Sequence, residues 1–332
     1  MVRARTPIVA YTEIVRGRRA LLSLIAVFTV LVAGTSLTRT VRSFYRLDFP
    51  VTWDERGLQV GGVPPGSSAS AAQLSSGDLI LEIDSISIDR LEDPVFVLAA
   101  GKEHRLTVTG ESGESRAVMF APPAPVIDPI YLARSAVGLF GLGCALVALW
   151  LTDRREAATF LLLAAASLIV GAVPNRIAST HQSLLIIYRM AGAALPFLMV
   201  RFFSIFPERE RSMWRWDLVT VLAVVSAAVT AMLPDLDAWW QMAASILRGV
   251  FASALLYGFV LYVGRWRAAV KLARERRQIE WAALGMIVGL VPYFALVMLP
   301  QWLGIGFEPF SWLAVVPLAA VPLGFLAALT EY

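Results

Sequence analysis

The side chains that most often carry catalysis are scarce in this chain. The sequence holds two histidines, His104 and His181, and one cysteine, Cys144. An H-E-x-x-H zinc site needs paired histidines and a glutamate base on one helix, and neither this motif nor a G-x-S-x-G elbow, a P-loop or a strand-linked G-x-G-x-x-G is present. A disulfide within the chain is excluded. We therefore expect no enzyme activity, no metal site and no cofactor.

Two arginines within apolar segments, Arg189 and Arg248, could bind an anion. They follow Ser183 and Trp239 by six and nine residues, which corresponds to a depth of about 9–14 Å along a helix. A charge at such depth in a membrane is costly and is by default a functional hypothesis. The partners left open are backbone carbonyl groups, an anionic ligand, and acidic residues near the segment ends: Asp235, Asp237 and Glu308.

Both interpretations of Arg189 and Arg248 stay open. One is a ligand-sensing or switching role within the membrane. The other is structural pairing combined with snorkelling, in which the charged head reaches the interface while the stem lies along apolar surface. Arg134 and Arg201 lie near segment ends, and we expect both to snorkel.

The interval Gly57–Ile88, GLQVGGVPPGSSASAAQLSSGDLILEIDSISI, is the centre of the only long polar part of the chain. A Pro-Pro-Gly turn precedes a small-residue run, Ala69–Leu74, that is typical of a short helix. Apolar residues then alternate along Leu79–Asp84. Such alternation around turns predicts a small sheet with one buried face.

On these residues the interval resembles a bacterial PDZ domain, whose pattern contains a Gly-Φ-x-Φ loop, a V-x-P-G-S-x-A turn and helix, and G-D-x-I-x-x-I-x. Two glycines that are usual in the family are replaced here, by Gln73 and by Ser85. A glycine of the loop is also replaced, by Gln59.

The PDZ resemblance implies that backbone N–H groups of Leu58, Gln59 and Val60 hold the C-terminal carboxylate of a peptide or protein, while the peptide adds a strand to the sheet. The predicted helix Leu91–Ala99 would wall the groove. Its pocket residues would be Val95, Phe96 and Leu98. The alternative is a PDZ-like fold that binds no terminus and serves as a spacer or a dimerising module, so a homodimer stays open.

The composition indicates a polytopic α-helical membrane protein. Of 332 residues, 58% are hydrophobic and 16% charged, whereas soluble domains carry about 25% charged residues. An apolar helix of about 20 residues can cross a hydrocarbon layer of about 30 Å. We predict about eight transmembrane helices: Ala20–Leu37, Ile130–Thr152, Ala157–Val173, Ser183–Phe206, Leu218–Leu233, Trp239–Val263, Trp281–Leu299 and Phe310–Leu329.

The predicted organisation places the small α/β PDZ-like domain between the first two transmembrane helices. We expect a cytoplasmic basic N-terminus at 1–19 and a first helix at 20–38. An extracytoplasmic PDZ-like domain with a Pro-rich linker follows at 39–127, and a seven-helix transmembrane sensor bundle at 128–332. The first helix could instead be a cleaved signal peptide, but its apolar run is longer than the usual core of about 7–15 residues.

Basic residues concentrate in alternate connections, most densely in Gly264–Glu280. The positive-inside rule then predicts that both termini are cytoplasmic and that the protein lies in the plasma membrane. Contact with anionic lipid headgroups accounts for this basic run, so we expect membrane lipids as partners and no nucleic acid.

The later segments resemble the multi-span sensor regions of bacterial histidine kinases, the competence and quorum-sensing type among them. The resemblance rests on RFFSIFPERE at Arg201–Glu210, RRQIEW at Arg276–Trp281 and the final PLAAVPLGFLAALTEY. Some members of that group carry a PDZ-like domain after the first helix. The resemblance implies a signal-sensing input module of a two-component-type system, relaying an extracellular or membrane signal to a cytoplasmic effector or kinase.

A kinase of this group needs a phosphoacceptor histidine and an ATP-binding domain beyond the last membrane helix, and the sequence stops at Tyr332. We expect either an isolated sensor fragment or a free-standing relative. The alternative function is a membrane-anchored PDZ scaffold that recruits the C-terminal peptides of partner proteins. A transporter is a third option, but the sequence shows no convincing internal repeat of the kind transporters contain.

Overall fold

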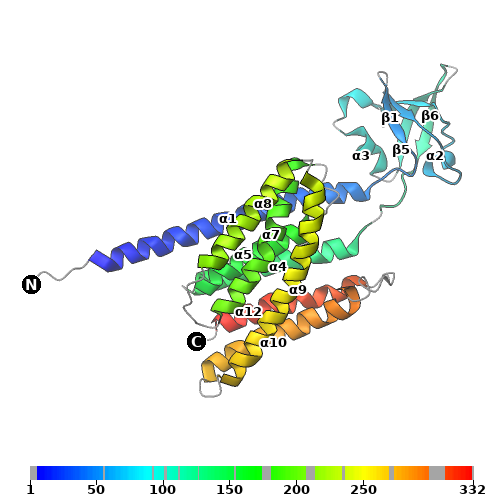
Figure 1. Cartoon of the computed structure of the whole chain (residues 1–332). Helices are drawn as coiled ribbons and strands as arrows, with labels where there is room; N and C mark the ends of the chain where they lie inside the picture. The colour runs from blue at the N-terminus through cyan, green and yellow to red at the C-terminus, as the bar shows by residue number, and fades with distance from the viewer. Residues whose placement is uncertain are drawn as a thin grey trace, which may run out of the picture. The chain divides into compact units, whose positions relative to one another are not determined.

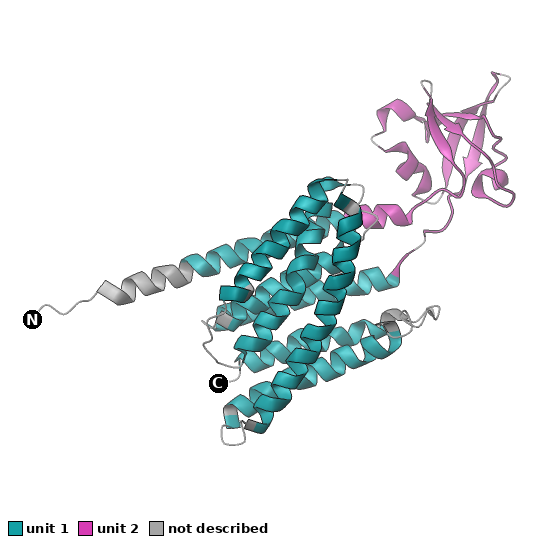
Figure 2. Cartoon of the chain, in the orientation of Figure 1, with its two compact units in different colours: residues 1–37, 129–332 teal, residues 38–128 magenta. Residues whose placement is uncertain are grey.

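Long apolar helices account for most of the described residues. The computed structural model divides the chain into two units, Met1–Leu37 with Pro129–Tyr332, and Thr38–Asp128 (Figure 2). We call them the helical unit and the sheet unit. The structure describes residues 6–54, 57–91, 93–100, 103–110, 113–125, 127–152, 155–173, 181–206, 214–233, 236–268, 273–298 and 311–330.

The helical unit contains the long helices drawn in Figure 1. The first of them, α1, continues past Leu37 into the residues of the sheet unit. The helices are α1 (Thr6–Phe44), α4 (Pro129–Leu151), α5 (Arg155–Ala172), α7 (Gln182–Ile205), α8 (Trp214–Met232), α9 (Asp237–Ala268), α10 (Ala273–Tyr293), the π-helical turn η4 (Phe294–Met298), the 3-10 turns η5 (Ser311–Ala314) and η6 (Val316–Ala319), and α12 (Ala320–Thr330).

Five helices among the described residues are long and apolar enough to cross a membrane. They are Gly17–Phe44, Pro129–Leu151, Gln182–Ile205, Ala238–Arg267 and Glu275–Leu296. Three shorter apolar helices accompany them: Glu156–Ala172, Asp217–Met232 and Val316–Thr330. The helical unit is therefore compatible with a multi-pass membrane protein.

The predicted last helix, Phe310–Leu329, is not continuous. Two 3-10 turns precede α12, which has only 11 residues. Pro317 lies in the second of these turns and Pro322 in the first turn of α12. Proline lacks the N–H that an interior helical position needs and disfavours helical geometry in the preceding residue. The two prolines therefore explain why a regular α-helix begins only at Ala320.

An aromatic cluster joins four helices of the helical unit. The ring of Phe325 on α12 lies 4.7 Å from that of Phe202 on α7 and 5.7 Å from that of Phe160 on α5. Arg265 of α9 donates hydrogen bonds to the carbonyl groups of Phe203, Ser204 and Phe206 at the end of α7. These carbonyl groups have no partner within their own helix, so one arginine caps α7 and ties it to α9.

The sheet unit is a small antiparallel sheet with three short helices. The strand order is β1-β2-β3-β5-β6, and β4 pairs with β3. The strands are β1 (Val51–Asp54), β2 (Gly57–Val60), β3 (Leu79–Ile83), β4 (Ile86–Ser87), β5 (His104–Thr109) and β6 (Ser115–Phe120). The helices are α2 (Ser68–Ala71), the 3-10 turn η1 (Ile88–Arg90) and α3 (Pro94–Ala99).

Buried apolar residues of the strands form the core of the sheet unit. Along β5 the odd and even positions differ: Leu106 and Val108 are fully buried, whereas Arg105 is exposed. The same core contains Leu58, Val60, Ile80, Ile83 and Phe120. This confirms the predicted sheet with one buried face.

The two residues that replace expected glycines have left-handed backbones. Gln73 has φ 58° and Ser85 has φ 65°, and Asp84 beside it has φ 53°. Asp84 and Ser85 form the two-residue connection between β3 and β4, a connection whose favoured turn needs positive φ at both positions. A side chain with a Cβ is strained there by about 1–2 kcal/mol.

Replacing Ser85 or Gln73 by glycine should stabilise the sheet unit. Each substitution relieves the left-handed strain but loses part of the gain to the greater freedom of glycine in the unfolded chain, so we expect about 0.5–1 kcal/mol. Hydrogen exchange of the core amides of β3 and β5 in the full chain measures this change in opening free energy. Ser85→Ala keeps a Cβ and should give no gain. Equal protection in the glycine and alanine variants would show that backbone strain is not the cause.

Candidate functional site

The stretch predicted to be a carboxylate-binding loop is a central strand. β2 pairs with β1 on one edge and with β3 on the other. Gly61 N–H donates to Pro50 O at 2.8 Å, and Val60 N–H donates to Asp78 O at 2.8 Å. Since hydrogen-bonding direction alternates along an antiparallel strand, the N–H groups of Leu58 and Val60 face β3 and that of Gln59 faces β1.

The role predicted for these three amides is therefore corrected. Both edges of β2 are occupied, so no peptide strand can be added beside it. The side chains of Leu58 and Val60 are buried in the core of the sheet unit, whereas that of Gln59 is exposed. The Gly-Φ-x-Φ pattern describes a buried strand here because its alternating apolar residues fill the core.

The three predicted pocket residues of α3 have different positions. Leu98 is fully buried in the core, and Val95 is partly buried against it. Phe96 is partly buried, and its ring meets Tyr45 edge-on at 5.7 Å and lies 5.3 Å from the guanidinium of Arg42. The structure therefore places Phe96 against Arg42 and Tyr45, in the chain segment that leads into the sheet.

The helix that carries these residues is shorter than predicted. It begins at Pro94, and its N-cap is Asp93, whose carboxylate accepts a hydrogen bond from the backbone N–H of Phe96 at 3.0 Å. Leu91 follows the turn η1, and Glu92 lies outside the described residues.

β1 is one of the two edge strands of the described sheet, the other being β6, and sequence reasoning did not identify it as an edge. β1 is the first strand in the sheet order, and three of its four residues are exposed. The carbonyl of Pro50 faces β2 because it accepts a hydrogen bond from the N–H of Gly61. Since the direction of the backbone groups alternates along a strand, the N–H groups of Val51 and Trp53 face away from β2. An edge strand with unpaired backbone groups is a template for an added strand.

The histidines do not form a metal site with other described residues. His104 contacts the carboxylate of Asp84 through Nδ1 at 2.8 Å and the carbonyl of Ala100 through Nε2 at 2.7 Å. The hydrogen bond between His104 and Asp84 is the main reason why the pKa of Asp84 lies below its usual value. His181 precedes α7 as its N-cap residue. No group of three potential metal ligands occurs among the residues that the structure describes.

Arg189 pairs with a carbonyl group and an aromatic ring. It is buried, with 4% of its surface exposed. Its guanidinium donates to the carbonyl of Thr230 on α8 at 2.8 Å and lies 5.0 Å from the centre of the Trp240 ring on α9. Backbone carbonyl groups were one of the predicted partners, and the ring adds a cation–π contact. Arg189 therefore connects α7 with α8 and α9.

Arg248 lies elsewhere and is exposed. Its guanidinium contacts its own helix, through Nε to the carbonyl of Ala244 at 3.3 Å and through Nη2 to the hydroxyl of Ser245 at 3.2 Å. Of the acidic partners considered for both arginines, Asp235 and Glu308 lie outside the described residues.

The two arginines expected to snorkel contact other helices. Arg201 of α7 forms an ion pair with Asp217 of α8, with 2.6 Å between Nη1 and Oδ1. Arg134 of α4 donates to the hydroxyl of Tyr293 on α10 at 3.2 Å and lies 6.0 Å from the centre of that ring. Partners on neighbouring helices were not visible in the sequence because each pair is separated by many residues.

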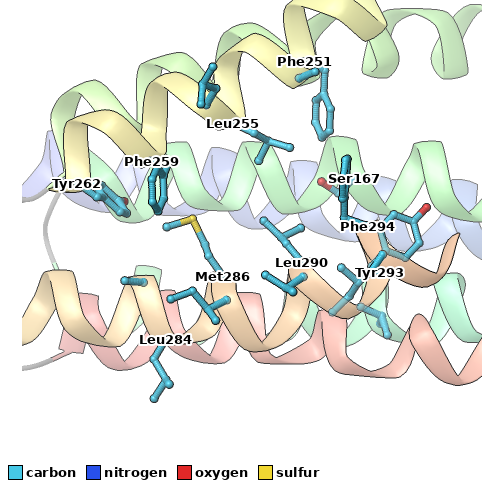
Figure 3. Close-up of a pocket in the computed structure, with 18 of the residues that line it drawn as sticks. Ser167, Phe251, Leu255, Phe259, Tyr262, Leu284, Met286, Leu290, Tyr293 and Phe294 are labelled. Atoms are coloured by element: carbon cyan, nitrogen blue, oxygen red, sulfur yellow. The ribbon is translucent and has the colours of Figure 1, made fainter. Parts of the chain in front are cut away.

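A cavity of about 1240 Å³ lies within the helical unit, and the sequence contained no signal of it. Its walls come mainly from α4, α5, α9 and α10. Phe251, Leu255 and Phe259 line it from α9, and Met286 and Leu290 from α10. Figure 3 shows Tyr293 and Phe294 at one end and Tyr262 at the other. The cavity is larger than the range of about 300–1,000 Å³ that is usual for small-molecule sites.

A second face of α10 lies directly on α12. A Cβ added at Gly285 would lie 2.5 Å from the carbonyl oxygen of Ala320 and 2.9 Å from the Cα of Gly324. At Gly289 it would lie 2.6 Å from a methyl group of Val321. Small residues at such a contact let two helix backbones approach closely. One helix, α10, thus lines the cavity and also holds α12 at backbone distance.

Gly285→Ala should destabilise the helical unit by about 1–3 kcal/mol, because the added methyl group forces two backbones apart. Thermal unfolding of the purified full chain measures the change. Gly143→Ala on α4 is the matched control, since nothing lies within 4 Å of an added Cβ there. It should leave stability unchanged or raise it by up to about 1 kcal/mol through helix propensity. Equal effects of the two substitutions would contradict a close α10–α12 contact.

Comparison with known proteins gives a local likeness. No family model matches the sequence. Among curated proteins, a stretch of 87 residues is 34% identical to the magnetosome formation protease MamE of Magnetospirillum gryphiswaldense. The matched stretch covers 22% of this chain and 11% of that protein. The chain thus spans about a tenth of the length of this curated relative, and the likeness is confined to one part of both proteins.

Proposed function

We propose that this chain is the signal-sensing membrane input module of a two-component-type system. In this proposal the chain crosses the plasma membrane about eight times, with both termini in the cytoplasm and the sheet unit outside as a PDZ-like domain. The five long apolar helices and the three shorter ones support this number of crossings. The left-handed backbones at Gln73 and Ser85, where the PDZ pattern has glycine, support the PDZ assignment.

The observation that carries the proposal is the double contact of α10. One face of this helix lines the cavity through residues such as Met286 and Leu290. Another face holds α12 through Gly285. A ligand that fits the cavity better in one arrangement of α10 would shift the population of that arrangement. Because the Gly285 contact leaves no room between the backbones, α12 would follow α10.

In this mechanism α12 is the output element. Its residues Phe325 and Leu329 are buried in the same core as Phe160 and Phe202, so a shift of α12 would require the aromatic cluster to repack. A packed cluster of this kind has discrete arrangements and does not deform continuously. A cytoplasmic effector or kinase would detect which arrangement is populated.

A residue that fills the cavity should mimic an occupant. We expect Leu290→Trp, in the full chain fused to a histidine kinase core, to change autophosphorylation by about fivefold or more, the low end of a typical allosteric coupling. Val288→Trp is the matched control, because Val288 lies two residues away on α10, is exposed and is not among the cavity-lining residues. Output that responds equally to both substitutions, or to neither, would contradict the relay.

A second candidate function is a membrane-anchored PDZ scaffold, and the open edge of β1 favours it. A C-terminal peptide could pair with the outward backbone groups of Val51 and Trp53. The Trp53 side chain, 60% exposed, would then offer apolar contact. In this second candidate function, a peptide would bind along β1 and not at the β2 amides.

Trp53→Pro should weaken the binding of C-terminal peptides about tenfold or more, because proline removes one outward-facing N–H, worth about 1 kcal/mol, and its ring obstructs an added strand. A peptide array probed with the full chain measures this. Trp53→Ala keeps the N–H and serves as the control for the lost side chain. An array that shows no carboxylate-dependent binding to the unmodified chain would remove the scaffold function and leave the sensor proposal intact.

A further inference from the structure

The two ends of the cavity in the helical unit differ in charge. At one end Arg134 lies beside the hydroxyl of Tyr293. At the other end the lining includes Glu280, whose carboxylate accepts hydrogen bonds from Arg276 at 2.8 Å and from Trp266 at 3.3 Å. Between the ends the walls are almost entirely aliphatic and aromatic. The cavity therefore offers a cationic end, an apolar passage and an already neutralised acidic end.

The guanidinium of Arg134 has hydrogen-bonding capacity left over. One Nη donates to Tyr293, whereas the Nε–H is buried without a hydrogen-bond partner among the described residues. A buried donor that is left unsatisfied lowers stability, more so when it belongs to a charged group. Carboxylates are the matching acceptors, because their two oxygen atoms fit the parallel N–H groups of one arginine.

A second arginine adds positive charge near this end. Arg248 lies three residues before Phe251 on α9, and Phe251 lines the cavity near Tyr293 and Phe294 (Figure 3). The only acidic residue that lines the cavity, within the part of the chain that the structure describes, is Glu280 at the far end. An anion therefore gains attraction at the Arg134 end without facing a nearby carboxylate.

The length of the apolar passage indicates the shape of the ligand. Ile279 and Tyr293 both line the cavity and are 14 residues apart on α10. At 1.5 Å per residue this is about 21 Å, which exceeds half of a hydrocarbon layer of about 30 Å. Such a passage is long enough for an extended long alkyl chain.

We propose that the cavity binds a long-chain fatty acid. The carboxylate accepts hydrogen bonds from the two Nη groups of Arg134, and the alkyl chain lies between α9 and α10 along Phe251, Leu290 and Met286 toward Tyr262. A phospholipid fits less well, because the polar end offers Arg134 and Tyr293 and few groups for a glycerol backbone or a larger headgroup. Binding stands without the proposed sensor function, and only its effect on α12 depends on that function.

The test is equilibrium binding of radiolabelled hexadecanoate to the full chain in nanodiscs of zwitterionic lipid. Hexadecanol has the same chain without the charge, so its weaker binding isolates the carboxylate. We expect hexadecanoate to bind about tenfold or more tightly than hexadecanol, as a charge-assisted hydrogen bond predicts. Equal affinity for the two ligands, or no saturable binding of either, would overturn the proposal.

Variants locate the site. Arg134→Gln should remove the preference for hexadecanoate and leave the affinity for hexadecanol unchanged. Arg134→Lys should keep part of the preference for hexadecanoate, and Leu290→Trp should weaken the binding of both ligands. Val288→Trp should bind as the unmodified chain does. An unchanged preference in Arg134→Gln would overturn the assigned carboxylate site. If that variant does not fold, the difference in affinity between hexadecanoate and hexadecanol on the unmodified chain still tests whether the carboxylate is recognised.

Native mass spectrometry distinguishes the fatty acid from a phospholipid. We expect hexadecanoate to displace any phosphatidylglycerol that copurifies with the chain. Phosphatidylglycerol that is retained at one per chain and is not displaced by hexadecanoate would overturn the fatty acid assignment. Saturable, Arg134-dependent binding of hexadecanoate with no change in the output of the kinase fusion would reject the relay and leave the fatty acid site standing.

Discussion

The close contact of α10 with α12 at Gly285 and Gly324 is the constraint on which the rest of the account depends. A Cβ added at either glycine would lie less than 3 Å from the backbone of the other helix. Two backbones at this distance cannot slide or tilt independently, because no side chain is present to rearrange between them. The cavity on another face of α10 and the aromatic cluster around Phe325 are thereby joined through one helix pair. This connection makes a binding event relevant to α12.

The arginines of the helical unit show how a largely apolar bundle holds charge. Arg265 caps the carbonyl groups at the end of α7, Arg189 donates to Thr230 and lies on Trp240, and Arg201 pairs with Asp217. Each joins two or more helices, which fits the general observation that buried charges are paired. Arg134 differs from these three because it lines the cavity. That difference separates a candidate binding group from structural ones.

Local sequence patterns predicted the elements well and the sites poorly. Period-two alternation identified the buried face of β5, whereas a register shift between Ile80 and Glu82 in β3 leaves Ile80 and Ile83 buried. Gln73 and Ser85, which stand where glycine was expected, have left-handed backbones. The Gly57–Val60 stretch was assigned to a loop because its short apolar pattern does not reveal how many neighbours a strand has. The cavity could not be predicted, since Arg134 and Tyr293 are 159 residues apart. Close helix contacts also depend on glycines that look the same in sequence, as Gly143 and Gly285 do.

The most direct test of the central claim is the distance between α12 and α4 with and without a ligand in the cavity. Spin labels at Leu323 of α12 and Leu139 of α4, both exposed in the described structure, report this distance by double electron–electron resonance in nanodiscs, in a Cys144→Ser background. The account predicts that hexadecanoate shifts the distance distribution of the unmodified chain and leaves that of Arg134→Gln unchanged. A distribution that saturating hexadecanoate does not alter, in a chain shown to bind it, would contradict the coupling of the cavity to α12.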